Sequence, residues 1–173
     1  MLAVFLIGRA AGAETPIRSI DLVQDSDRYV ADIVMFAPVP AHVAWEVLTD
    51  FEHMAAWVPN VRESRVVARD ADTVTVEQQG VAKFGLASLP YTSLRQLRLD
   101  PQRTIRSIQI KGNLRRLESL MTLAQDGSGT QLTYHLEMVP GGLAAAILSK
   151  DLLRQELTEQ FIAIIEEMIR RAH

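Results

Sequence analysis

The fold of this chain is decided by residues 114–139, which read LRRLESLMTLAQDGSGTQLTYHLEMV. On either side of the turn-rich run Gln125–Gly129, apolar and polar residues alternate, which is the pattern of a β-strand with one buried face. Because so short a connection joins neighbouring strands of opposite direction, the stretch predicts an antiparallel hairpin of Leu114–Ala124 and Thr130–Val139. The face predicted to point inward carries Leu117, Ser119, Met121 and Leu123 in the first strand and Leu132, Tyr134, Leu136 and Met138 in the second.

Upstream of this hairpin, similar patterns predict further strands, separated by turns rich in glycine, proline and charged residues. These strands are Tyr29–Phe36, Val61–Ala68, Thr73–Gln79, Ala82–Ala87, Tyr91–Leu99 and Thr104–Ile110. Two short helices are expected between the first two runs. Pro40 can start a helix over Ala41–Leu48, and Asp50 can cap a second one that continues to Trp57.

Residues 144–173 are predicted to form one long C-terminal helix, because Leu153, Leu157 and Phe161 recur at helical spacing. A helix is about 10–12 Å thick, whereas about seven strands make a sheet face about 30 Å wide. One helix cannot cover that face, so the sheet is expected to curl around it. The result is an α+β fold with a curved antiparallel sheet of about six to seven strands and a gap lined by apolar side chains, which is a default ligand cavity.

The composition is that of one ordinary globular domain, with 173 residues of which 48% are hydrophobic and 23% charged. There are no cysteines, which excludes disulfides, zinc–thiolate sites and a cysteine nucleophile. The net charge is −3, with both signs interspersed. Nucleic acid is therefore not expected as a partner, because such a partner favours a basic excess.

The domain is predicted to span residues 28–173, with residues 1–27 as a lead-in that can contain a truncated signal segment. Met1–Ile7 is apolar, and the small residues Ala11-Gly12-Ala13 precede Glu14 in the manner of a signal cleavage site. No basic residue precedes the apolar run, and Arg9 interrupts its end. The expected location is periplasmic or exported if this segment is a signal, and cytoplasmic otherwise.

Residues 40–61, PAHVAWEVLTDFEHMAAWVPNV, resemble the START-like (SRPBCC, helix-grip) superfamily. The family pattern in this region is a helix that ends in V-L-x-D, a short helix containing an aromatic residue, and W-x-P-x-V. Residues 114–119, followed by Gly129-Thr130 and an alternating last strand, also resemble its coenzyme Q-binding branch. The resemblance covers roughly residues 28–171 and implies a helix-grip fold, with the sheet wrapped around the C-terminal helix.

The resemblance also implies that the protein binds or transports a hydrophobic small molecule, such as a lipid, an isoprenoid quinone or a polyketide-like compound. The alternative is a cyclase- or dehydratase-type enzyme that uses the same cavity. An enzyme is less favoured, because Tyr134 is the best-placed acid or base that alternation supplies, and core packing explains it as well. No cofactor is expected, and the four histidines lack metal-ligand spacing, so no metal site is expected.

The residues expected to line the cavity are Trp57, Val76, Gln78, Arg95, Arg106, Ile108, Leu117, Ser119, Met121, Tyr134, Leu136, Met138, Leu153 and Leu157. Gln78, Arg95 and Arg106 are of special interest, because alternation places these polar side chains on an apolar face. Buried polar groups need partners, so they can hold a carbonyl, hydroxyl or carboxylate of a ligand. The alternatives are a bulge that shifts the strand register, or a place at the cavity mouth in contact with water.

Residues 86–90, LASLP, are apolar for a connection between strands. If the connection is exposed, Leu86 and Leu89 can contact a membrane or a lipid-bearing carrier transiently. If it is covered, these residues belong to the core. A third possibility is a regulatory module that binds another macromolecule through this loop.

Overall fold

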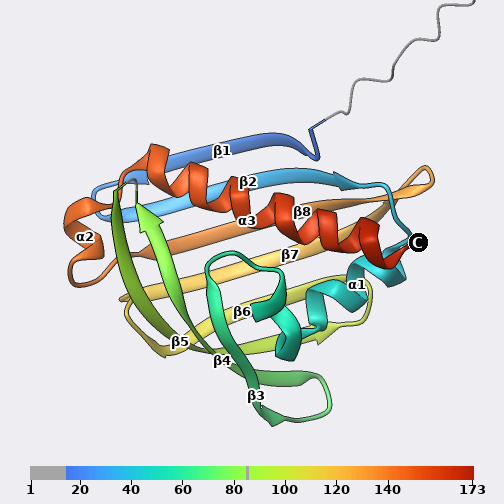
Figure 1. Cartoon of the computed structure of the whole chain (residues 1–173), viewed down its shortest axis with the longest axis horizontal. Helices are drawn as coiled ribbons and strands as arrows, with labels where there is room; N and C mark the ends of the chain where they lie inside the picture. The colour runs from blue at the N-terminus through green and yellow to red at the C-terminus, as the bar shows by residue number, and fades with distance from the viewer. Residues whose placement is uncertain (1–14, 85) are drawn as a thin grey trace, which may run out of the picture.

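The computed structural model of the chain describes residues 15–84 and 86–173, and it consists of one curved antiparallel sheet that grips a long helix (Figure 1). The sheet has eight strands in the order β1-β2-β8-β7-β6-β5-β4-β3. The strands are β1 (Ile17–Asp25), β2 (Arg28–Ala37), β3 (Val61–Arg69), β4 (Thr73–Phe84), β5 (Ala87–Asp100), β6 (Thr104–Gly112), β7 (Arg116–Asp126) and β8 (Gly129–Val139). The α+β helix-grip prediction is confirmed, with eight strands rather than six to seven.

The helices close the concave side and one end of the sheet. They are α1 (Ala41–Thr49), the 3-10 helix η1 (Phe51–Ala56), α2 (Ala144–Ile147) and α3 (Lys150–Arg171). Figure 1 shows α3 running across the sheet, with α1 near its C-terminal end. None of the helices formed by the described residues is long and apolar enough to cross a membrane.

The core lies where α3 meets the sheet. The buried α3 residues Leu157, Phe161 and Met168 recur at helical spacing and form one cluster with the fully buried Ile33 and Leu132 of the central strands. The helix packs against β1 and β2 on one side and against β4 on the other. In the sheet order, β8, β7, β6 and β5 lie between these two contacts, so α3 bridges over the middle of the sheet.

Strand β1 lies within residues that the sequence assigned to the lead-in, and it precedes the strand expected to open the fold. It pairs antiparallel with β2 from Ile17 to Asp25. Only Leu22 of this edge strand is buried, so the period-two pattern that reveals a strand is nearly absent. The predicted signal segment falls on residues 1–14, outside the described residues.

Three predicted strands, Thr73–Gln79, Ala82–Ala87 and Tyr91–Leu99, form only two in the structure. Strands β4 and β5 pair continuously from Thr73 opposite Arg98 to Phe84 opposite Ala87. Gly80 does not break β4, because a Cβ atom at this position would lie 1.9 Å from the backbone oxygen of Asn60, and only glycine permits that approach. Most of the expected Leu86–Pro90 connection is therefore the first part of β5.

The two helical regions also differ from the prediction in detail. The segment after Asp50 is a 3-10 helix, and the Asp50 side chain does not cap it. The C-terminal helix is interrupted before Lys150, where the Ser149 hydroxyl accepts a hydrogen bond of 3.3 Å from the backbone of Leu152 and caps α3. A serine N-cap therefore separates the short α2 from α3, in a stretch whose apolar spacing alone favours one helix.

Candidate ligand cavity

A cavity of about 530 Å³ lies between α3 and the middle strands of the sheet. This volume is within the range of small-molecule sites in proteins, about 300–1,000 Å³. The cavity exists because α3 rests on β1, β2 and β4 and leaves the inner faces of the strands between them uncovered. Its apolar wall includes Leu97, Leu117, Met121, Leu136 and Met138 from the sheet and Leu153, Leu157, Phe161 and Ile164 from α3.

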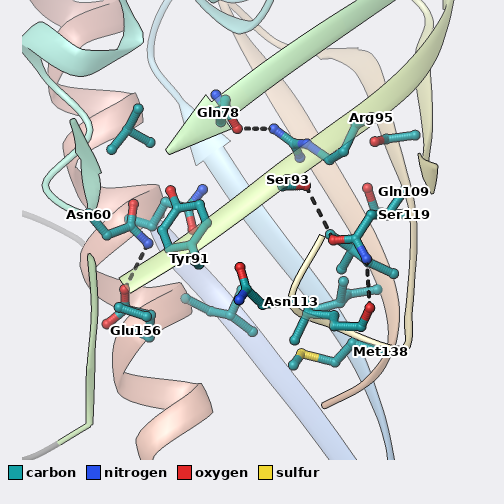
Figure 2. Close-up of a pocket in the computed structure, with 18 of the residues that line it drawn as sticks. Asn60, Gln78, Tyr91, Ser93, Arg95, Gln109, Asn113, Ser119, Met138 and Glu156 are labelled. Atoms are coloured by element: carbon teal, nitrogen blue, oxygen red, sulfur yellow. Dashed lines mark hydrogen bonds between the residues drawn. The ribbon is translucent and has the colours of Figure 1, made fainter. Parts of the chain in front are cut away.

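Arg95 is the main charged group of the sheet wall. Its guanidinium donates a hydrogen bond from Nη2 to Oε1 of Gln78, as Figure 2 shows. Gln78 is held in turn, because its amide Nε2 donates to Oγ of Ser64 at 3.1 Å and to Sδ of Met54 at 3.3 Å. Both Gln78 and Arg95 line the cavity, so this network presents a fixed guanidinium to it.

The charge of Arg95 is not balanced by an acid. Within residues 15–84 and 86–173, no carboxylate forms a salt bridge with it, and its Nε is buried without a hydrogen-bond partner. Burial lowers the pKa of Arg95, whereas the nearby Tyr134 and Tyr91 act in the opposite direction. Because a guanidinium stays protonated in proteins, the cavity wall carries a positive charge with unused donors.

Tyr134 of β8 supplies a hydroxyl to the same region. Its ring meets the ring of Phe161 edge-on, with the centroids 4.9 Å apart. Burial raises the pKa of Tyr134, and Ser119 and Arg95 offset part of this effect. Burial likewise raises the pKa of Tyr91 to about 12. Both phenols are therefore neutral hydroxyl groups near pH 7, able to donate as well as accept hydrogen bonds.

A second polar group lies on the α3 side of the cavity. Asn60 donates a hydrogen bond of 2.7 Å from Nδ2 to Oε1 of Glu156, and the pair lies beside Tyr91 in Figure 2. Oδ1 of Asn60 is buried without a partner. Burial raises the pKa of Glu156, an effect that the hydrogen bond from Asn60 opposes.

Strand β6 contributes a third group of polar atoms. Ser93 of β5 donates to Oε1 of Gln109 at 3.3 Å, and Nε2 of Gln109 donates to the backbone oxygen of Leu114 at 2.8 Å. Ser107 also lines the cavity, and its hydroxyl is buried without a partner. Three cavity residues, Arg95, Asn60 and Ser107, thus hold buried polar atoms that no protein group satisfies.

The prediction that Arg106 and Ile108 line the cavity is wrong. Both are exposed on the outer face of β6, Ile108 to 42%, whereas Ile105 and Ser107 are buried and face inward. The cause is an ambiguous pattern, because Ile105 has the opposite parity to Ile108 and Ile110. The prediction assigns Ile108 and Ile110 to the inward face, although both are exposed, and so exchanges the inner and outer faces of the strand.

Two other expected lining residues do not border the cavity either. Val76 is fully buried in the core, and Trp57 packs its ring 6.0 Å from the Arg171 guanidinium. The structure places the remaining expected residues around the cavity: Gln78, Arg95, Leu117, Ser119, Met121, Tyr134, Leu136, Met138, Leu153 and Leu157.

Sequence reasoning did not find Asn60, Glu156, Ser107 or Gln109 as cavity residues. The available signal for Glu156 was its position between Leu153 and Leu157, which places it at the edge of the apolar stripe of the helix. Among the residues that the structure describes, no group of three or more histidine, aspartate or glutamate side chains could hold a metal ion.

Comparison with known proteins identifies the family but not the ligand. Residues 37–163 match the family model described as "Polyketide cyclase / dehydrase and lipid transport". No curated protein matches the chain in sequence.

Several solved structures share the fold at low sequence identity. TTHA0849 from Thermus thermophilus is 17% identical with a TM-score of 0.71, and the match covers 83% of this chain and 99% of that one. The ZhuI aromatase/cyclase from Streptomyces sp. R1128 is 18% identical with a TM-score of 0.70, over 84% and 96% of the two chains. A STAR-related lipid transfer protein from Xanthomonas axonopodis is 16% identical with a TM-score of 0.64, over 86% and 98%.

These structures establish the fold alone, whereas the family model covers well over half of the sequence. The chain therefore belongs to the polyketide cyclase/dehydrase and lipid transport family.

Proposed function

We propose that this protein binds and carries a hydrophobic small molecule that has an acidic or carbonyl group at one end. The observation that supports this most directly is Arg95, a charged donor without an acidic partner in a cavity whose wall is mostly apolar. Leaving buried donors unsatisfied is costly, and a carboxylate or carbonyl oxygen of a ligand would satisfy them.

The remaining lining fits a ligand with a long apolar body. Leucine and methionine side chains from β7, β8 and α3 contribute to the apolar wall, and methionine adapts its shape to different ligands. Burial of the apolar body supplies affinity at roughly 25 cal/mol per Å², while the polar groups fix the orientation. Asn60 and Glu156 suit a hydroxyl group elsewhere on the ligand, since each has an oxygen that can accept a hydrogen bond from it.

A matched pair of lipids tests this function. Oleic acid and oleyl alcohol share the same chain and differ in the polar group, so their affinities isolate the contribution of a carboxylate. The wild-type protein is expected to bind oleic acid at least about tenfold more tightly, because the charge-assisted bond to Arg95 is strong. Arg95→Met is expected to remove this preference, whereas Arg106→Met, on the outer face, is expected to keep it.

Extraction of the freshly purified protein with organic solvent, followed by mass spectrometry, provides a second measurement. The expected result is a co-purifying apolar compound. A protein that yields no such compound and binds neither oleic acid nor oleyl alcohol contradicts the proposed function.

The second candidate function is cyclase- or dehydratase-type catalysis in the same cavity. The observation in its favour is that Tyr134 combines a hydroxyl of raised pKa with the nearby charge of Arg95. A neutral phenol beside a guanidinium can donate a hydrogen bond to a carbonyl oxygen on which negative charge develops. Turnover of a polyketide-type substrate that is lost in Tyr134→Phe, with binding retained, would favour catalysis over carriage.

A further inference from the structure

Ser107 places an unpaired hydroxyl deep in the cavity wall. The residue lies on β6, is only 3% exposed and lines the cavity. Its Oγ forms no hydrogen bond with any residue in the ranges 15–84 and 86–173. A buried hydroxyl without a partner lowers the stability of a protein, because it has given up its hydrogen bonds to water. Packing alone therefore does not explain a serine at this position.

The pairing of the strands explains why Ser107 finds no partner in the protein. It faces Leu97 across β5 and Ser119 across β7. Leu97 has no polar side-chain atom, and Ser119 is close enough to Tyr134 to lower the pKa of that phenol. Gln109, the next inward residue of β6, already uses both its amide oxygen and its amide nitrogen in hydrogen bonds. The hydroxyl of Ser107 is therefore free to bind a ligand.

Ser107 lies a short distance from the Arg95 charge, on the neighbouring strand. Arg95 is two residues from Leu97, which faces Ser107, so the Cα atoms of Arg95 and Ser107 are about 7–8 Å apart as diagonal neighbours. The guanidinium extends toward Gln78 of β4, as Figure 2 shows. Because β4 and β6 flank β5, up to two strand spacings, roughly 10 Å, separate the two polar points. One extended ligand can reach both, with several carbon atoms between its two oxygen-bearing groups.

We propose that Ser107 binds an oxygen within the apolar chain of the ligand, and that the ligand is a fatty acid with a hydroxyl or carbonyl group several carbons from its acidic end. This inference rests on the proposed function, because it takes Arg95 as the site of the acidic end. The Ser107 hydroxyl can donate to a carbonyl oxygen, and it can donate to or accept from a hydroxyl.

The surroundings of Ser107 make this contact selective. Ile105 precedes it on the inner face of β6, Leu97 faces it, and Met121 lies diagonally across β7, and all three line the cavity. An oxygen placed against these side chains would be buried without a partner, which costs affinity. An unsubstituted chain leaves the Ser107 hydroxyl unpaired instead. The cavity should therefore prefer one position of the oxygen along the chain.

Isothermal titration calorimetry of the full chain with a matched set of acids tests the proposal. The set consists of octadecanoic acid and the same acid with a hydroxyl on carbon two, carbon seven or carbon ten. The wild type is expected to bind at least one of the two mid-chain hydroxy acids about tenfold more tightly than octadecanoic acid, because the new hydrogen bond satisfies a buried group. The carbon-two acid is expected to gain nothing, because its hydroxyl lies beside the carboxylate.

Ser107→Ala is expected to reduce the mid-chain preference to about onefold. Its affinity for octadecanoic acid is expected to match that of the wild type, because Arg95 and the apolar wall are unchanged. A preference that survives in Ser107→Ala overturns the proposal, since another group, such as Asn60, would then hold the oxygen.

Thr130→Val is the matched control, because it removes a buried hydroxyl that does not line the cavity. Thr130 is fully buried, and its Oγ1 donates a hydrogen bond of 2.8 Å to the backbone oxygen of Val39. This variant is expected to keep the mid-chain preference and to melt below the wild type, because it leaves that oxygen unpaired.

Thermal denaturation without ligand then separates a binding role of Ser107 from a structural one. Ser107→Ala is expected to melt at or above the wild-type temperature, because it removes an unpaired hydroxyl and breaks no hydrogen bond. A loss of stability equal to that of Thr130→Val shows that the hydroxyl supports the fold, and it overturns the proposal.

The outcome is distinguishable from that of the proposed function. If the wild type binds octadecanoic acid but no mid-chain hydroxyl improves its affinity, this inference alone is overturned. A gain confined to the carbon-two acid has the same consequence. If no acid of the set binds, both the inference and the proposed function are overturned.

Discussion

Arg171, at the end of α3, donates a hydrogen bond of 2.7 Å to Asp50, which joins α1 to η1. The same guanidinium donates to Glu167 at 2.7 Å, and the Glu167 side chain is only 6% exposed. Hydrogen bonds from Arg170 and Arg171 hold the pKa of Glu167 below its ordinary value, although burial of the carboxylate acts in the opposite direction. This network therefore links the C-terminal end of α3 to the junction of α1 and η1.

Arg171→Met is expected to lower the free energy of unfolding by about 2 kcal/mol, because it leaves the buried Glu167 with fewer partners. Urea denaturation measures the change. The matched control is Arg98→Met, which removes an exposed ion pair with Asp72 at 3.0 Å and is expected to cost less than about 1 kcal/mol. Equal losses in the two variants would show that the network adds nothing beyond a surface ion pair.

Glu156→Gln is expected to make the stability of the protein less dependent on pH. Because the pKa of Glu156 is raised in the folded state, this group favours folding below its ordinary pKa of 4.5, and the benefit is lost as the pH rises through the folded value. Glutamine does not titrate and still offers Oε1 to Asn60. The variant should therefore gain stability relative to the wild type as the pH is raised from about 4 to neutrality and passes through the raised pKa of Glu156.

Urea denaturation across this pH range measures the effect. Glu166→Gln, an exposed position on the same helix, serves as the control and is expected to follow the wild-type profile. A Glu156→Gln variant whose stability keeps a constant offset from the wild type at every pH contradicts the prediction.

Gly80→Ala is expected to lower the free energy of unfolding by about 2–3 kcal/mol, because the added Cβ would clash with a rigid backbone atom. It would lie 1.9 Å from the oxygen of Asn60 and 2.7 Å from the ring of Tyr91. Thermal and urea denaturation measure the loss. The control is Gly127→Asn, at a turn with φ of 60° and open space around it, where asparagine is tolerated. Wild-type stability of Gly80→Ala would mean that β3 and β4 separate easily at this point.

Tyr134→Phe is expected to weaken binding of an oxygen-bearing ligand by no more than about fivefold, because it removes one hydrogen bond and keeps the ring contact with Phe161. Isothermal titration calorimetry with oleic acid measures this change. Tyr134→Ala, which also removes the ring, is expected to lose considerably more affinity. Equal affinities for the Phe and Ala variants would exclude the ring from the binding wall.

Much of the cavity could be predicted because some strands carry an unambiguous pattern. Val74 and Val76 fix the inward face of β4 and so place Gln78, and Leu97 does the same for Arg95 on β5. The pattern failed on β6, where isoleucines occur at both parities. The outward ones are tolerated at the surface, so hydrophobicity alone does not distinguish the faces.

The remaining features depend on tertiary contacts that no local pattern encodes. Strand β1 escaped prediction because an edge strand that buries only Leu22 has little alternation. The pair of Asn60 and Glu156 joins residues 96 positions apart, and it exists only because α3 lies over the start of β3. The long-range placement of the helix therefore decides these features.

The way α3 is held separates the part of the protein that stabilises the fold from the part that borders the cavity. The helix rests on β1, β2 and β4, whereas Leu117 and Met121 on β7 border the cavity and lie outside those main contacts. Shortening such side chains enlarges a space that exists, instead of opening a new void in a packed core. Residues on the floor of the sheet can therefore change while the scaffold persists, so the proposed ligand preference could be altered without loss of the fold.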